Sequence, residues 1–187
     1  PGGRFRPRLD VATPFDPFRV RAADFDGDGA LDLVATGQAE SRLAVLYGRG
    51  DGTFRVGPAA ATGDTPWGVA AADFDGNGSP DVVVASATAG DFTTFLNAGD
   101  GTFPRRLRTP VLGGAVAAAQ GDVNNDGFAD LVTADNAAGT VAVRLGQGDG
   151  TFRAAATYPV GTAPTAVALT DGNRDGRLDV VVTNALD

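Results

Sequence analysis

An acidic nine-residue pattern recurs four times in this chain, and each copy begins 49 residues after the one before it. The pattern reads D-x-[DN]-x-[DN]-G-x-x-D, and the copies begin at Asp24, Asp73, Asp122 and Asp171. No residue is inserted or deleted between copies, so the register is kept throughout. A repeat of this kind indicates one small structural unit that is used several times, with a core formed between neighbouring units.

The alternation of oxygen-bearing side chains in each copy matches the requirements of a calcium ion. Ca²⁺ binds six to eight oxygens at ~2.3–2.6 Å, and carboxylates or amides at alternate positions of a tight loop supply them. Positions 1, 3, 5 and 9 would contribute side-chain oxygens, and position 7 a backbone carbonyl. Position 6 is Gly in every copy, where a chain that folds around an ion turns sharply. The pattern therefore predicts about four bound Ca²⁺.

The composition supports this interpretation. The chain has 22 Asp and a single Glu, Glu40, and 13 of the Asp lie in the four acidic copies. The formal net charge is −8, which four Ca²⁺ would cancel. All 15 basic residues are Arg, they are scattered along the chain, and the sequence pI is about 4.4. We therefore expect no nucleic-acid partner.

The chain offers little for catalysis or for membrane insertion. It contains no His, Cys or Lys and only three Ser, so most nucleophile and general-base arrangements are unavailable. No apolar run approaches the ~18 residues of a membrane span. We expect a protein that is not an enzyme and does not insert into a membrane. Because the chain has no Met at all, we also expect it to be a piece of a longer precursor.

The segments between the acidic copies have the pattern of short strands. A second marker, Gly-Asp-Gly-Thr-Phe, lies at 50–54, 99–103 and 148–152, with a degenerate copy at 1–5. β-Branched runs at 31–35, 81–85, 130–133 and 179–183 follow the acidic copies, and alternating segments such as 42–47 and 140–145 come next. The sequence predicts an all-β fold, a β-propeller-type array of four-stranded antiparallel blades. A solenoid of stacked β-units is the main alternative.

The 49-residue period divides the chain into units at about 1–49, 50–98, 99–147 and 148–187, which we expect to form a single repeat domain. Asp187 aligns with Ala138, so the fourth unit would lack one strand. At the other end, Phe5 to Val11 align with the outer strand that follows each Gly-Asp-Gly turn. Unpaired strand edges invite pairing with another chain, so the expected partners are copies of the chain or further repeats of a longer one.

The acidic pattern, the Gly-Asp-Gly-Thr-Phe turn and linkers such as Val160-Gly-Thr-Ala-Pro164 together resemble the FG-GAP or VCBS-type repeats of bacterial surface proteins. These repeats are related to the calcium-binding repeats of integrin α-chain propellers. The resemblance covers essentially the whole chain and implies an extracellular or cell-surface protein with Ca²⁺ between the first two strands of each blade. Carried over by position, the metal ligands are Asp24, Asp26, Asp28, Ala30 and Asp32; Asp73, Asp75, Asn77, Ser79 and Asp81; Asp122, Asn124, Asp126, Phe128 and Asp130; Asp171, Asn173, Asp175, Arg177 and Asp179.

Three other interpretations of the acidic copies compete with this one. An EF-hand would carry Glu at position 12, where this chain has Ala35, Val84, Thr133 and Val182. Calcium-binding nonapeptide repeats would recur every nine residues. Asp, Asn and Gly also form ordinary polar turns, which would explain one copy well but four identical spacings poorly.

The expected function is a calcium-stabilised structural or adhesion module, a building block of a surface or fibrous assembly. The alternative is a propeller that binds glycans or surface proteins, as a lectin or an integrin-like adhesion head does. The units carry no elaborated loops that would form a dedicated binding face, which favours the structural role.

Overall fold

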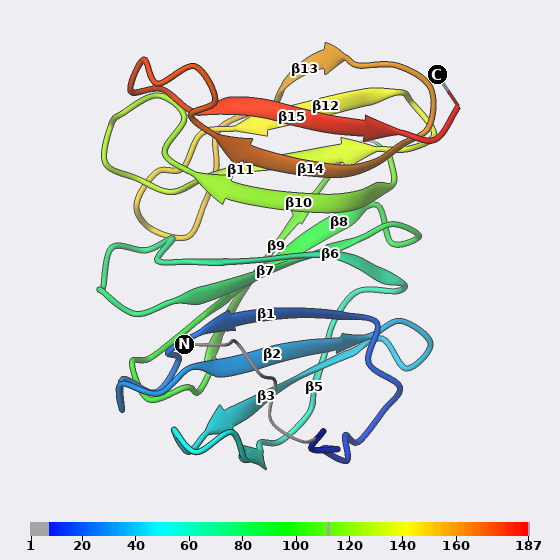
Figure 1. Ribbon diagram of the computed structural model, residues 1–187. Coiled ribbons are helices and arrows are strands. Elements are labelled where there is room, and N and C mark those ends of the chain that lie inside the picture. The colour runs from blue at the N-terminus through cyan, green and yellow to red at the C-terminus, as the bar shows by residue number, and fades with distance from the viewer. Residues whose placement is uncertain (1–7, 112, 187) are drawn as a thin grey trace, which may run out of the picture.

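The computed structural model describes residues 8–111 and 113–186, and these residues form fifteen β-strands and no helix. The strands build four antiparallel sheets that lie one above the other along the chain (Figure 1). The predicted all-β, propeller-like array of blades is therefore confirmed.

In each of the first three sheets, the first four strands pair in sequence order, and sheet 1 has a fifth strand that pairs with its third. Sheet 1 contains β1 (Arg19–Ala23), β2 (Asp32–Gly37), β3 (Arg42–Gly48), β4 (Phe54–Val56) and β5 (Ala60–Ala61). Sheet 2 contains β6 (Pro66–Ala72), β7 (Asp81–Ser86), β8 (Asp91–Leu96) and β9 (Arg105–Pro110). Sheet 3 contains β10 (Ala115–Gly121), β11 (Asp130–Asp135), β12 (Thr140–Arg144) and β13 (Ala156–Pro159). Sheet 4 contains β14 (Pro164–Thr170) and β15 (Asp179–Asn184).

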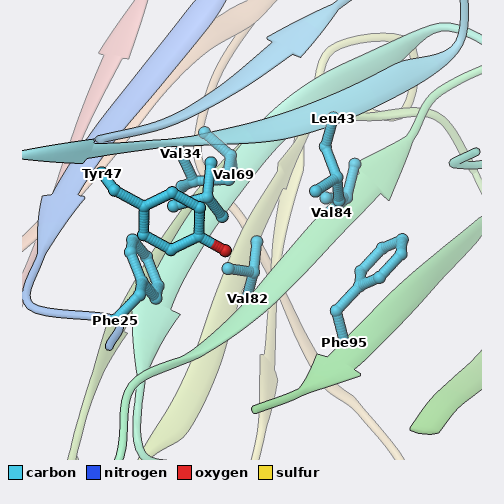
Figure 2. Packing of buried hydrophobic residues seen from close by; sticks show 9 residues of the cluster. Phe25, Val34, Leu43, Tyr47, Val69, Val82, Val84 and Phe95 are labelled. Carbon is cyan, nitrogen blue, oxygen red and sulfur yellow. The ribbon is translucent and has the colours of Figure 1, made fainter. Parts of the chain in front are cut away.

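The core lies between the sheets, because each central strand is apolar on both faces. The predicted β-branched runs form β2, β7, β11 and β15, and β7 is buried along its full length. Alternate residues of a strand point to opposite faces, so sheet 1 presents Val34 and Val45 to sheet 2, while sheet 2 presents Val82 and Val84 to sheet 1. Figure 2 shows Val34, Val82 and Val84 in one cluster with Phe25 and Phe95.

The first strands of the four sheets, β1, β6, β10 and β14, lie side by side along one edge of the stack (Figure 1). The sequence predicts a crowded position there because these strands contain many small residues. At Gly68 in β6, an added Cβ would lie 3.1 Å from the backbone of Ala117 and Ala118 in β10. This close approach confirms the expected crowding, and it makes β1, β6, β10 and β14 the inner strands of the array.

The sheets do not coincide with the units expected from the sequence. The strand after each Gly-Asp-Gly turn pairs back on the preceding hairpin, so that β9 pairs with β8 and β13 with β12. A sheet therefore ends about ten residues after the turn. As a result, sheet 4 has two strands, β14 and β15, where the sequence analysis predicted a unit with three.

Sheet 1 also has a broken outer edge. Pro58 has no N–H to donate, and the edge divides into β4 and β5, which both pair with β3. Residues 5–7 of the outer strand expected at Phe5 to Val11 lie outside the described residues, and Arg8 to Val11 form no strand.

Candidate metal centre

The four acidic copies lie where the resemblance predicted, between the first two strands of each sheet. They form loop 1 (24–31), loop 2 (73–80), loop 3 (122–129) and loop 4 (171–178), and in each the position-9 Asp begins the second strand. Position 6 has a positive φ of 84° to 89° in every loop. Position 4 is left-handed as well, at Gly27, Gly76, Asn125 and Arg174. Two left-handed residues separated by one position curl the loop into a tight cup.

The position-1 carboxylate organises the interior of each cup. In loop 1, Asp24 Oδ1 accepts a hydrogen bond from Gly27 N at 2.8 Å, and its Oδ2 accepts one from Gly29 N at 2.9 Å. Asp73 accepts the same two N–H groups in loop 2. In loops 3 and 4, Oδ2 of the position-1 Asp again accepts from the position-6 Gly, whereas Oδ1 accepts from the position-5 N–H. This carboxylate therefore orders the loop backbone around itself before any ion binds.

Loops 1 and 2 bring three carboxylates together. In loop 1 these are Asp24, Asp26 and Asp28, and in loop 2 they are Asp73, Asp75 and Asp81. Within each group, one oxygen per residue lies within 4.8 Å of the others. Three convergent carboxylate oxygens on a tight turn suit a hard divalent cation.

In loop 2, position 5 departs from the expected arrangement. The Asn77 side-chain oxygen accepts from Ser79 N at 2.7 Å, and its side-chain nitrogen donates to the Asn97 carbonyl at 2.8 Å. Asn77 is thus turned toward the neighbouring β8 end, and Asp81 joins the carboxylate group instead.

Loops 3 and 4 carry a hydrogen bond where loop 1 has a third carboxylate. The Asn124 side-chain nitrogen donates to Asp126 Oδ2 at 2.9 Å, and Asn173 donates to Asp175 Oδ2 at 3.1 Å. A cation in either loop would have to replace this amide at the carboxylate. Among the described residues, no group of three acidic ligands was found in these two loops.

The pKa shifts follow this division only in part. Burial raises the pKa of Asp81 to about 6, with Asp75 and Asp73 adding to the rise against two backbone hydrogen bonds. Desolvation, and then the charge of Asp32, raises the pKa of Asp26. In loop 3, by contrast, the hydrogen bond from Asn124 lowers the pKa of Asp126. Burial, with the charges of Asp126 and Asp122 adding to it, also raises the pKa of Asp130 in loop 3. Loops 1 and 2 differ from loop 3 in that they bring three carboxylates together, and a divalent cation fits that donor set.

The FG-GAP-like repeat model matches three times, at residues 24–84, 74–133 and 122–182, and together the matches cover most of the chain. The chain belongs to the FG-GAP-like repeat family. Each match spans an acidic loop, the hairpin that follows it and the next acidic loop.

Solved structures share the fold of these FG-GAP-like units. The N-terminal part of BBS1, crystallised with ARL6, superposes with a TM-score of 0.63 at 16% identity, over 92% of this chain and 51% of that one. The Tc holotoxin pore of Photorhabdus luminescens gives 0.57 at 21% identity over 88% and 8%. A protein of unknown function from Desulfotomaculum acetoxidans gives 0.51 at 11% identity over 93% and 64%. The chain spans about half, or far less, of the first two solved chains, and no curated protein sequence matches it.

The position-9 Asp of each FG-GAP-like unit has a structural role that the sequence did not reveal. Asp32 is fully buried; its Oδ2 accepts from Phe25 N at 2.8 Å and its Oδ1 from Gly48 N at 2.7 Å. Asp81 and Asp130 join the loop to the end of the third strand in the same way. Within the described residues, Asp179 makes only the loop contact, which Gly172 N donates at 3.0 Å. The sequence pattern had indicated a role for this residue only as a metal ligand.

A second feature is that loops 1 and 2 contact the next FG-GAP-like unit. The carbonyl of Phe74, at position 2 of loop 2, accepts from Gly150 N in the turn of sheet 3 at 2.9 Å. Its ring packs edge-on against Phe152 with centroids 5.5 Å apart. In loop 1 the corresponding ring, Phe25, packs on Phe103 at 6.0 Å. The signal was present in the sequence as an aromatic residue at position 2 of the first two loops and after every turn.

Asn97 makes this contact at the boundary between sheets 1 and 2. Its side-chain nitrogen donates to the carbonyls of Phe25 at 2.7 Å and Pro80 at 2.9 Å, while its oxygen accepts from Gly99 N and Gly101 N. Asn97 thus occupies the place of the direct bond between Gly150 and Phe74 at the next boundary. We call these loop-to-turn contacts the seam.

The position-7 residues, Ala30, Ser79, Phe128 and Arg177, close each cup. Their N–H groups donate to the position-5 side chain at 2.7 to 3.0 Å. Their carbonyls stay predicted ligands. In the described residues, no helix is long and apolar enough to cross a membrane.

Proposed function

We propose that this chain is a calcium-stabilised structural module of an extracellular surface or fibrous assembly. The observation that carries the proposal is the seam. Phe74, at position 2 of loop 2, donates its N–H to the Asp81 carboxylate at the end of the same loop. Its carbonyl accepts a hydrogen bond from Gly150 N in the turn of sheet 3. An ion that orders the loop would therefore also order the boundary with the next sheet.

The energetic scale supports a stabilising role for calcium. A domain of this size has a net stability of about 5–15 kcal/mol. One site held at a hundred times its dissociation constant adds ~2.7 kcal/mol by mass action. Two to four such sites would rival the whole net stability, so the protein would be fully rigid only in the millimolar calcium of an extracellular medium.

The two end faces support the assembly role. Val20 on the outer face of sheet 1 is 49% exposed, whereas its counterpart Val69 in sheet 2 is 1% exposed beneath sheet 1. Val181 on the outer face of sheet 4 is 49% exposed, whereas its counterparts in the other sheets are fully buried. The two faces are the two halves of the internal sheet–sheet interface, so the sheet 4 face of one copy suits the sheet 1 face of another.

Phe15 covers part of the outer face of sheet 1 and so limits the surface that another copy could contact. Its side chain is buried against Ala35, Ala44 and Leu46 and covers part of the sheet 1 face. Beside it lies a mainly apolar cavity of about 290 Å³, lined by Val20 and Leu33 among others.

Calorimetric titration with Ca²⁺, together with melting curves in calcium and in EDTA, tests the proposal. We expect uptake of two to four ions and a melting temperature that falls substantially in EDTA. No uptake, with an unchanged melting temperature, would contradict it. Light scattering in calcium should show multimers, whereas a stable 18.8 kDa monomer would contradict the assembly role.

A further inference from the structure

Two arginines of β1 project where the other sheets have small residues. One repeat length after Arg19 and Arg21, the inner strands carry Gly68 and Ala70, and Ala occupies both positions in β10 and β14 as well. Both arginines line a groove of about 290 Å³ along the inner strands, whose other walls include Gly68, Ala117 and Ala166. The small residues of the other three sheets thus leave an open groove, and the two arginines of the first sheet lie along one of its walls.

Neither of these guanidinium groups has a carboxylate partner among the residues that the structure describes. The ion pairs found among residues 8–111 and 113–186 are Arg8 with Asp10 and Arg108 with Asp91. The one hydrogen bond that the Arg21 side chain donates within that part of the chain goes to the neighbouring Val20 carbonyl. Burial and the nearby charge of Arg19 both lower the pKa of Arg21. In a chain with 23 acidic residues, two adjacent unpaired arginines form an isolated positive site.

Aromatic contacts hold one of the arginines in place beside an apolar wall. The Arg19 guanidinium lies 4.4 Å from the centre of the Phe18 ring. Phe18 in turn packs edge-on against Trp67, with ring centroids 5.3 Å apart. Trp67 itself lines the groove. The groove therefore combines a paired cationic end with the indole of the only Trp in the chain.

We propose that this groove binds a carboxylate-bearing saccharide. The planar guanidinium groups of Arg19 and Arg21 suit a carboxylate through paired N–H donors. The indole of Trp67 offers an apolar surface to the sugar ring. The volume lies at the small end of the ~300–1,000 Å³ that small-molecule sites occupy, which suits one ring of an acidic saccharide. The site is independent of the calcium loops, so it goes beyond the structural role proposed above.

Fluorescence of Trp67 reports on this groove without any label, because the chain has no other Trp. The calcium-loaded protein is titrated with glucuronate, glucose and acetate at constant free calcium, and each titration is repeated by calorimetry. We expect saturable binding of glucuronate and at least tenfold weaker binding of both glucose and acetate. The Arg21→Gln and Arg19→Gln variants should bind glucuronate about tenfold or more weakly, the usual effect of losing a charge-assisted hydrogen bond.

The matched control is Arg49→Gln, which removes one positive charge from an exposed turn outside the groove. It should bind glucuronate as the unmodified chain does. Three results would overturn the proposal: no glucuronate binding by either method, equal weakening in the Arg49 control, or acetate binding as tight as glucuronate. The last result would reduce the site to one for simple carboxylates.

Discussion

At the scale of single residues, the buried position-9 carboxylates have a role in the fold that does not depend on the proposed metal. Asp32 accepts two backbone N–H groups that no other group satisfies, and it does so within a fully buried site. The sequence identified this Asp by its chemistry but not its partners, because the Gly48 N–H comes from a strand 16 residues later. Spacing alone cannot show which backbone groups a carboxylate meets.

Replacing Asp32 by Ala should destabilise the protein in EDTA as well as in calcium. Two buried N–H groups would lose their acceptor, at a cost of about 1–3 kcal/mol each. Asp51→Ala, at an exposed turn where the carboxylate accepts from Thr53, should cause a much smaller loss. Chemical denaturation of both variants in excess EDTA measures the difference. Equal losses of stability, or an Asp32→Ala effect that vanishes in EDTA, would count against the structural role of Asp32.

Asn97 offers a sharper test of the seam, because the equivalent position in sheets 1 and 3 is occupied by Gly. Asn97→Asp replaces a side-chain nitrogen by an oxygen facing two carbonyls, and it should cost about 3 kcal/mol or more. Asn97→Gly should cost less, because the equivalent residues at the other sheets are Gly48 and Gly146. Urea unfolding of the two variants provides the comparison. The proposed seam would be wrong if the Asp variant were the more stable of the two.

At the scale of the elements, most strands could be placed from the sequence, whereas their division into sheets could not. The β-branched runs and the Gly-Asp-Gly turns fix hairpins, since periodicity and turn chemistry are local signals. Tertiary packing decides whether the strand after a turn pairs with the strand before that turn or joins the next sheet. Because it pairs with the strand before the turn, the sheets are shifted relative to the expected units. The loops follow the same rule: their type could be predicted, but not the hydrogen bond from Asn124 to Asp126.

The loops should differ in affinity in a way that one substitution can reverse. Asn124→Asp adds a carboxylate at position 3 of loop 3 and removes the amide that now binds Asp126. Calcium affinity of that loop should rise toward that of loop 1, because charge count tunes calcium sites. The control Gln38→Glu adds the same charge in the turn between β2 and β3, which lies outside all four acidic loops. Calorimetry should show one class of sites tightening only in the loop variant, and no change there would contradict the assignment.

At the scale of the whole molecule, the two end faces of the array are the surfaces that we propose to pair with each other or with further repeats. The sheet 1 end presents Val20 and the sheet 4 end presents Val181, both half exposed. The sequence predicted open edges, but the faces became visible only when each residue could be compared with its buried counterparts in the other sheets. Such faces are heterologous, so association through them extends indefinitely unless the rotation closes a ring.

Two end variants should complement each other. Val20→Glu blocks the sheet 1 face and Val181→Glu blocks the sheet 4 face, so each variant alone should be a monomer. An equimolar mixture should form a 1:1 dimer and nothing larger, because only one intact interface remains between them. Analytical ultracentrifugation in calcium distinguishes the species. If the mixture stays monomeric while the unmodified chain forms multimers, association uses another surface.

Hydrogen exchange at the Gly150 amide tests the central claim most directly, because this group lies outside every acidic loop yet donates to the Phe74 carbonyl of loop 2. If calcium orders the boundary between sheets through the seam, adding calcium should slow exchange at Gly150 by an amount comparable to that within loop 2. Protection confined to the loops, with Gly150 exchanging equally fast in calcium and in EDTA, would contradict the account.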